Sequence, residues 1–182
     1  NGLLGSRKSQ TYSNFNDFMY NLSYWSSWSN GFNIWKSEFD KIDKNLKLNK
    51  LFPHTSLFLT QHQAKLFCIN DNLLFDVQRI PKRGGHNKFE AFTIEYPSLL
   101  DECCKKGHIS TKCKKHILFG IMVQFLPSLL FNKYIIRIET FDDTGFRDNL
   151  KKYYPSYAYW LVLISVLGVP FRLFCRKLKN KR

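Results

Sequence analysis

Three cysteines and two histidines lie within fourteen residues near the middle of the sequence: Cys103, Cys104, His108, Cys113 and His116. Thiolates and imidazoles at this density can bind zinc. The spacing from His108 to Cys113 resembles half of a zinc knuckle, but the other half needs Cys-x-x-Cys, and Cys103 and Cys104 are adjacent. Surrounding lysines favour thiolates and repel a cation. The metal candidates are Cys104, His108, Cys113 and His116, and the alternative is a disulfide-linked or solvated loop.

Catalytic motifs are missing from the sequence. Gly84-Gly85 is not followed by a Walker or Rossmann spacing, and neither a Ser/His/Asp order nor an HExxH motif is present. Asp142-Asp143 precedes Thr144-Gly145, a combination that commonly makes a turn. We therefore expect a protein that is not an enzyme, with no cofactor and no small-molecule substrate.

A long apolar run lies near the carboxyl end. Tyr153 to Phe171 is nineteen residues without a formal charge, or roughly 28 Å of helix, close to the hydrocarbon thickness of a bilayer. Aromatic residues, including Tyr157 and Trp160, crowd its start, and basic residues, including Arg172, Arg176 and Lys177, follow it. These are the expected membrane-interface residues, and Arg172 is expected to reach the headgroups. The run predicts a transmembrane helix over 153–175, kinked or ended near Pro170; a buried helix of a soluble protein is the alternative.

The charge distribution predicts an orientation and leaves a second class of partner open. The formal net charge is +14, and the last eleven residues supply six positive charges. The positive-inside bias places the tail, 176–182, in the cytoplasm and the preceding residues in the lumen or outside. Membrane lipid is thus the expected partner. A basic protein bound to RNA or to a ribonucleoprotein, with its last helix buried, is the alternative.

A luminal location would have two consequences. Asn21-Leu22-Ser23 is a glycosylation sequon, so Asn21 is the candidate for a glycoprotein site. Cys68, Cys103, Cys104 and Cys113 could form two disulfides whose pairing the sequence leaves open. The sequence begins at Asn1 and shows no signal peptide, so a luminal location needs an upstream segment.

Residues 51–142 read as a β-rich domain. Short apolar or alternating runs predict strands, and "PKRGGHN" between two of them has turn chemistry; the predicted strands are "SLFLTQ", "KLFCIN", "LLFDVQRIP", "KFEAFTIEY" and "KYIIRIETF". The run 117–131 is interpreted as a buried strand and a turn, with a second membrane pass as the alternative. The predicted fold is a membrane-anchored, mainly antiparallel β domain with a carboxyl-terminal transmembrane helix.

The remaining boundaries follow from composition. Residues 1–50 form a polar and aromatic amino-terminal segment, whose rings either pack onto the domain or lie against headgroups. Within it, 37–50 is predicted to be a short helix or a polar approach to a strand. Residues 143–152 are the linker between the predicted β domain and the predicted membrane helix.

The segment "GFRDNLKKYYPSYAYWLVLISVLGVPFRLF" resembles the carboxyl-terminal part of the transmembrane protein 231 family, which belongs to the transition zone of cilia. The matching positions are Gly145, Phe146, Lys151, Tyr157, Leu161, Arg172 and Phe174. Upstream, "QRIPKRGGHNKFEAFTIEYP" is similar to a strand, turn and strand of that family, and Gly31-Phe32 and Trp35 are similar to its Gly-Phe-Trp segment. About half of the chain is covered. The first membrane helix of the family is absent, and the stretch before the last helix is shorter.

The resemblance implies two membrane passes with a β-rich domain between them. It also implies a subunit of a tectonic-like complex, a non-enzymatic scaffold that limits exchange of membrane proteins at the base of the cilium and supports cilium biogenesis. Its partners would be membrane lipid and the other membrane proteins of that complex. Its location would be the ciliary membrane at the transition zone, with the basic tail in the cytoplasm.

Overall fold

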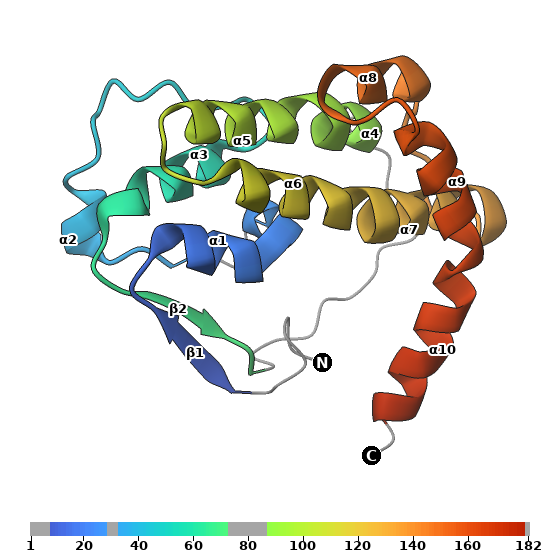
Figure 1. Ribbon diagram of the computed structural model, residues 1–182, viewed down its shortest axis with the longest axis horizontal. Helices are drawn as coiled ribbons and strands as arrows, with labels where there is room; N and C mark the ends of the chain where they lie inside the picture. Colours follow the sequence, from blue (N-terminus) through green and yellow to red (C-terminus); the bar gives the residue numbers. More distant parts are fainter. Residues whose placement is uncertain (1–7, 29–32, 73–86, 181–182) are drawn as a thin grey trace. The chain divides into compact units, whose positions relative to one another are not determined.

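The structure, a computed structural model, describes residues 8–28, 33–72 and 87–180, and side chains of the last helix as far as Cys175. Helices dominate these residues, and their sheet consists of two short strands (Figure 1). The prediction of a mainly antiparallel β domain is therefore wrong.

The described elements follow one another in a simple order. The strands are β1 (Ser9–Tyr12) and β2 (Phe67–Asn70). The α-helices are α1 (Phe15–Leu22), α2 (Lys36–Phe39), α3 (Pro53–Leu59), α4 (Lys88–Glu90), α5 (Tyr96–Lys105), α6 (Thr111–Gly120), α7 (Leu126–Leu130), α8 (Phe146–Tyr153), α9 (Ala158–Leu167) and α10 (Val169–Asn180). Short 3-10 helices are η1 (Ser23–Ser27) and η3 (Thr60–Gln63), and π-helical segments are η4 (Ala91–Glu95), η5 (Ile121–Phe125) and η6 (Phe131–Ile135).

The chain divides into two compact units, each built from two stretches of sequence. The first unit comprises Asn1–Leu74 and Glu95–Ile117, and the second comprises Phe75–Ile94 and Leu118–Arg182. Each unit is considered by itself below.

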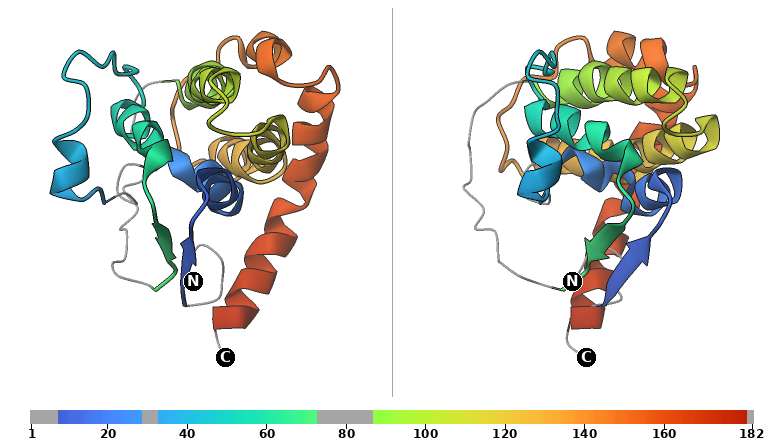
Figure 2. Two further views of the ribbon diagram at one scale, coloured as in Figure 1. Left: turned by 60° about the vertical axis from the view of Figure 1, so that its left-hand side comes forward. Right: turned by 90° about the vertical axis from the view of Figure 1, so that its left-hand side faces the viewer.

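The first unit buries a cluster of phenylalanine rings beside its two strands. β1 and β2 lie side by side (Figure 2) and pair antiparallel, with Ser9 opposite Asn70 and Tyr12 opposite Phe67. Phe18 of α1 stacks on Phe67 at 5.0 Å between ring centroids and meets Phe58 of α3 at 5.7 Å. Because each of these rings is at most 7% exposed, the cluster is a core rather than a surface layer.

The segment "KFEAFTIEY" shows why the β prediction failed. Phe89, Phe92, Thr93 and Tyr96 are all buried, at positions i, i+3, i+4 and i+7 of a helical stretch. A pattern of period two and a pattern of period 3.6 share several positions over nine residues, so the alternation admitted both interpretations. Thr93 is polar, but its hydroxyl donates to the Phe89 carbonyl at 2.7 Å, which satisfies it inside a helix.

Of the other predicted strands within the described residues, one is confirmed in part and the rest are wrong. "SLFLTQ" lies in α3 and η3, and "KYIIRIETF" runs from η6 into an irregular loop, so neither is a strand. "KLFCIN" contains β2, so this prediction is confirmed in part. The run 117–131 is helical rather than a strand and a turn. "LLFDVQRIP" lies outside the described residues, as does "PKRGGHN" except Asn87.

Two of the π-helical segments lie just before prolines. η4 ends two residues before Pro97, and η5 ends two residues before Pro127. Proline has no N–H, and its ring clashes with the carbonyl of residue i−4, so a helix that continues through it must widen or bend. A π-turn is such a widening, and these helices continue as α5 and α7.

The second unit has its own core. Phe89 packs on Phe146 of α8 at 4.6 Å and on Phe141 of the preceding loop at 5.6 Å. The Tyr154 hydroxyl donates to the Phe92 carbonyl at 2.7 Å, which fixes the end of α8. α9 then packs against α7, η5 and α8 (Figure 1). The apolar run predicted to cross a membrane thus begins at a core of folded protein.

Candidate membrane-attachment site

Two stretches of the described residues are apolar and long enough to be considered as membrane segments. The continuous helix Thr111–Ile135 has 25 residues and a mean hydropathy of 1.3 over its most apolar window, half of which is buried. The second is the pair Ala158–Leu167 and Val169–Cys175, bent by 48°. Core helices of soluble proteins can be as long and as apolar as membrane helices, so the exposure of their side chains distinguishes the two.

A row of large apolar side chains is exposed along α9 and α10. Its members follow one another at alternating spacings of three and four residues, which places them on one face of a helix; they are Tyr157, Trp160, Ile164, Leu167, Phe171 and Phe174. Their exposed fractions run from 59% to 81%, the highest at Leu167. We call these six residues the apolar stripe. Apolar rows of this extent are rare on the surface of monomeric soluble proteins.

The opposite face of α9 is ordinary protein core. Ala158 and Val162 are fully buried, and Val169 at the start of α10 is 3% exposed. Tyr159 meets the ring of Phe146 at 6.0 Å between centroids, and the guanidinium of Arg147 lies 5.3 Å from the Tyr159 ring centroid. The same helix therefore packs on folded protein with one side and presents the apolar stripe with the other.

Arg172 departs from the prediction that it reaches the headgroups. Its Nη1 donates to the Val123 carbonyl at 2.6 Å, and its Nη2 is buried without a partner among the described residues. In an α-helix the donor for the Val123 carbonyl would be the N–H of residue 127, which is a proline and has none. Arg172 supplies a donor to that carbonyl and ties α10 to η5.

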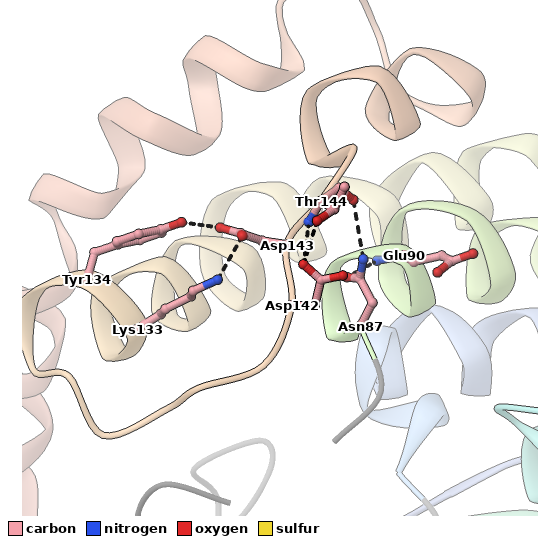
Figure 3. Close-up of polar contacts among 7 residues, drawn as sticks. All are labelled: Asn87, Glu90, Lys133, Tyr134, Asp142, Asp143 and Thr144. Carbon is pink, nitrogen blue, oxygen red and sulfur yellow. Dashed lines mark hydrogen bonds and ion pairs between the residues drawn. The ribbon is translucent and has the colours of Figure 1, made fainter. Parts of the chain in front are cut away.

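A polar cluster holds the loop that leads from η6 to α8 (Figure 3). The Lys133 Nζ lies 2.7 Å from Asp143 Oδ1, and the Tyr134 hydroxyl donates to Asp143 Oδ2. Beside it, Asp142 Oδ1 accepts from the backbone N–H of Thr144 at 2.9 Å, and Asn87 Nδ2 donates to the Thr144 carbonyl at 3.3 Å. The predicted turn at Asp142–Gly145 is present, with Gly145 at φ 74° in the left-handed region.

Electrostatics keep both acids of this turn ionised. Burial raises the pKa of Asp143, but the hydrogen bonds from Lys133 and Tyr134 outweigh it, so this pKa lies below its usual value. The hydrogen bond from the Thr144 side chain, followed by that from its backbone, lowers the pKa of Asp142. These carboxylates therefore serve as acceptors that stabilise the loop.

A small pocket lies where α8 meets α9, lined by Arg147, Lys151, Tyr159 and Trp160 among others. Its volume is about 70 Å³, whereas pockets that bind drug-sized ligands run from roughly 300 to 1,000 Å³.

The four metal candidates do not converge among the described residues, where no group of three His, Cys, Asp or Glu side chains is placed to hold an ion. His108 stacks on His62 at 3.5 Å between ring centroids, and His116 stacks on Tyr20 at 3.9 Å. Cys104 Sγ lies 3.7 Å from the Thr111 hydroxyl, and Cys113 Sγ donates to the Asn16 carbonyl at 3.6 Å. Each candidate thus has a partner of its own.

The cysteines are all free thiols in the structure, so the disulfides considered from the sequence are not formed. Burial, followed by neighbouring cysteines, raises the pKa of Cys103 and of Cys113 to about 12, so both are neutral at pH 7. Cys68 is exposed on β2, whereas Cys175 is half-buried on α10.

The remaining candidates lie in the amino-terminal segment and in α10. Asn21 is exposed near the end of α1, where its Nδ2 donates to the Asp17 carbonyl at 2.8 Å. The aromatic residues of the amino-terminal segment divide between the two alternatives: Phe15 and Phe18 are buried, whereas Trp28 and Trp35 are 43% and 83% exposed. The side chains of Arg176 and Lys177, and residues 181–182, lie outside the described part of the chain.

Sequence reasoning named Tyr157 and Trp160 but missed Ile164, Leu167 and Phe171 as members of one exposed face. The signal was present, because the spacing of three and four residues continues from Tyr157 to Phe174. It was hidden by Leu161, Val162 and Leu163, which are equally apolar and face other directions.

Comparison with known proteins finds no matching family model, no matching curated protein and no matching solved structure.

Proposed function

We propose that this chain is a non-enzymatic, membrane-anchored scaffold protein, held in a bilayer by the apolar stripe of α9 and α10. The observation that carries the proposal is the exposure of six large apolar side chains on one face. Burying a side chain such as Leu, Ile or Phe is worth about 1.5–3 kcal/mol. Even at partial gain for each, the apolar stripe supplies several kcal/mol of attachment energy.

The ends of the apolar stripe support a bilayer as the occupant. Tyr157 and Trp160 stand at its beginning, where amphipathic rings suit the headgroup layer. Basic residues follow its end, and no acidic residue occurs after Asp148. An anionic membrane surface complements this distribution of apolar and positive groups.

The test is alkaline carbonate extraction of the full chain from cells. Ending the chain at Leu150 would remove Tyr154, Ala158 and Val162 from the core, so substitutions in the apolar stripe are the cleaner change. We expect wild-type chain in the membrane pellet and the double variant Ile164→Arg, Leu167→Arg in the supernatant. Each substitution replaces an apolar side chain that would meet the bilayer with a charge, which costs up to roughly 2.5–3.5 kcal/mol on insertion scales.

The matched control makes the same change elsewhere. Leu48 and Leu66 are exposed in the first unit, at 41% and 66%, so Leu48→Arg, Leu66→Arg should stay in the pellet. Release of the wild-type chain would contradict the proposal and favour the RNA-bound alternative, which salt-sensitive RNA capture then checks. If the double variant Ile164→Arg, Leu167→Arg stayed fully in the membrane pellet, that result would also contradict the proposed membrane anchor.

The resemblance to the transmembrane protein 231 family adds a finer proposal: a subunit of a membrane-protein complex at the ciliary transition zone. Its support is the set of matching positions from Gly145 to Phe174. The upstream segment "QRIPKRGGHNKFEAFTIEYP" no longer supports the resemblance through a second strand, because residues 88–96 are helical. Fluorescence microscopy of the tagged chain in ciliated cells tests it, with enrichment between the basal body and the axoneme expected. A uniform distribution over other membranes would reject it.

A further inference from the structure

The apolar run does not form one straight helix. α9 ends at Leu167, α10 begins at Val169, and their axes differ by 48°. The break has a local cause, because Pro170 lacks an N–H for the Val166 carbonyl. The ten residues of α9 extend about 15 Å, half of a hydrocarbon layer of about 30 Å. α9 alone is therefore too short to cross a bilayer.

α10 carries two different faces. Phe171, Phe174, Cys175 and Leu178 occupy positions i, i+3, i+4 and i+7, so they share one face of the helix. Phe171 is 70% exposed and Phe174 is 59% exposed. The basic positions Arg176 and Lys179 lie three residues apart, on an adjoining face of the helix.

This division is typical of helices that lie in the plane of a membrane surface. A spanning helix needs apolar residues on every side that lipid covers, whereas α10 has basic residues at three of its last seven positions before Asn180. Arg172 donates to the Val123 carbonyl, so the basic residues left for lipid are those from Arg176 onward. They stand next to the apolar face rather than beyond the far end of a long apolar helix.

We propose that α10 lies in the headgroup layer of an anionic leaflet, with Phe171 and Phe174 toward the acyl chains and the basic positions from Arg176 onward toward lipid phosphates. The inference rests on the proposed membrane anchor and specifies its lipid and its geometry. Figure 2 shows α10 continuing from the end of α9 in a different direction. The bend sets the direction of α10 relative to α9, so that α10 can lie along the surface of the bilayer.

The first test measures lipid preference. Full chain is synthesised in a cell-free system with vesicles of phosphatidylcholine, with or without phosphatidylserine, and bound chain is separated by flotation. A lysine or arginine near an anionic surface contributes roughly a fivefold gain in binding. The triple variant Arg176→Gln, Lys177→Gln, Lys179→Gln should therefore bind the anionic vesicles about 100-fold more weakly. Its binding to the neutral vesicles should be unchanged.

The matched triple variant Lys44→Gln, Lys47→Gln, Lys50→Gln removes the same charge from exposed positions of the first unit and should bind like wild type. Equal binding of wild-type chain to both vesicles, or an equal loss in both triple variants, would overturn the inference. Binding to neither vesicle would instead overturn the membrane anchor itself, so the two failures are distinguishable.

The second test measures depth. A fluorescent amino acid at position 171, 174 or 178 is quenched by lipids with spin labels at known depths. A helix in the plane places the three positions at equal depth, whereas a spanning helix separates positions 171 and 178 by about 10 Å at about 1.5 Å per residue. A steady change of depth along the helix would overturn the inference even if anionic lipid is preferred.

Discussion

The phenylalanine cluster of the first unit and the apolar stripe of α9 and α10 are built from similar side chains and end in opposite environments. Phe15, Phe18, Phe58 and Phe67 are each at most 7% exposed. Phe171 and Phe174 are 70% and 59% exposed. Both regions look apolar in the sequence, so composition does not separate a core from a docking face. What differs is whether other elements of the chain return to cover them, as α3 and β2 do for α1.

The largest contrast is expected between single truncations in the two regions. Phe18→Ala leaves a cavity in the cluster and should lower the free energy of unfolding by about 3–5 kcal/mol. Phe171→Ala removes an exposed ring and should change it by less than about 0.5 kcal/mol. Urea unfolding followed by circular dichroism measures both. Similar losses for the two variants would mean that the apolar stripe is covered within the chain.

Removing the guanidinium on the inner side of α10 comes next. Arg172→Leu should lower the free energy of unfolding by about 1.5–3 kcal/mol, because a charge-assisted hydrogen bond to the Val123 carbonyl is lost. Lys115→Leu, at an exposed position, is the matched loss of a positive charge and should be nearly neutral. The same unfolding assay decides, and equal effects would show that Arg172 contributes only its charge.

A hydroxyl deletion sharpens the division between the inner and outer sides of this region. Tyr154→Phe removes the donor to the Phe92 carbonyl and should cost about 0.5–1.5 kcal/mol. Tyr157→Phe, at a ring 60% exposed, should cost nothing measurable in the same experiment. A reversed order would place the folded core on the side that we assign to the membrane.

The smallest effect is expected at the loop before α8. The pKa of Asp143 is lower in the folded chain than in the unfolded chain, so its contribution is complete above pH 4 and is lost as pH falls through the folded value. Wild type should exceed Asp143→Asn in unfolding free energy by up to about 1 kcal/mol at pH 6. Urea unfolding at pH 6 and pH 3 should show this gap closing, and a gap independent of pH would exclude the carboxylate as its source.

The sequence predicted the carboxyl-terminal helical run and its kink near Pro170 because nineteen uncharged residues and a proline leave few other interpretations. It failed for 88–96 because nine residues are too few to separate a period of two from a period of 3.6 when Thr93 is buried and satisfied by its own helix. No local signal pairs β1 with β2, whose partners lie about sixty residues apart.

The candidate site was predictable only in part. Tyr157 and Trp160 follow from their place at the edge of an apolar run. That Leu167 is exposed while Val162 is buried depends on which face of α9 meets α7 and η5, and this contact joins segments distant in sequence. The hydrogen bond from Arg172 to the Val123 carbonyl likewise depends on Pro127, which lies 45 residues earlier in the chain.

The contact between Arg172 and Val123 makes the residues at positions 127 and 172 interdependent. With proline at 127, the Val123 carbonyl lacks the donor that an α-helix would give it, and Arg172 provides one. An alanine at 127 would restore the backbone N–H, and the chain could then lose Arg172 at little cost. A double-mutant cycle of Pro127→Ala and Arg172→Leu should therefore be non-additive, and among relatives of this chain the two positions should change together.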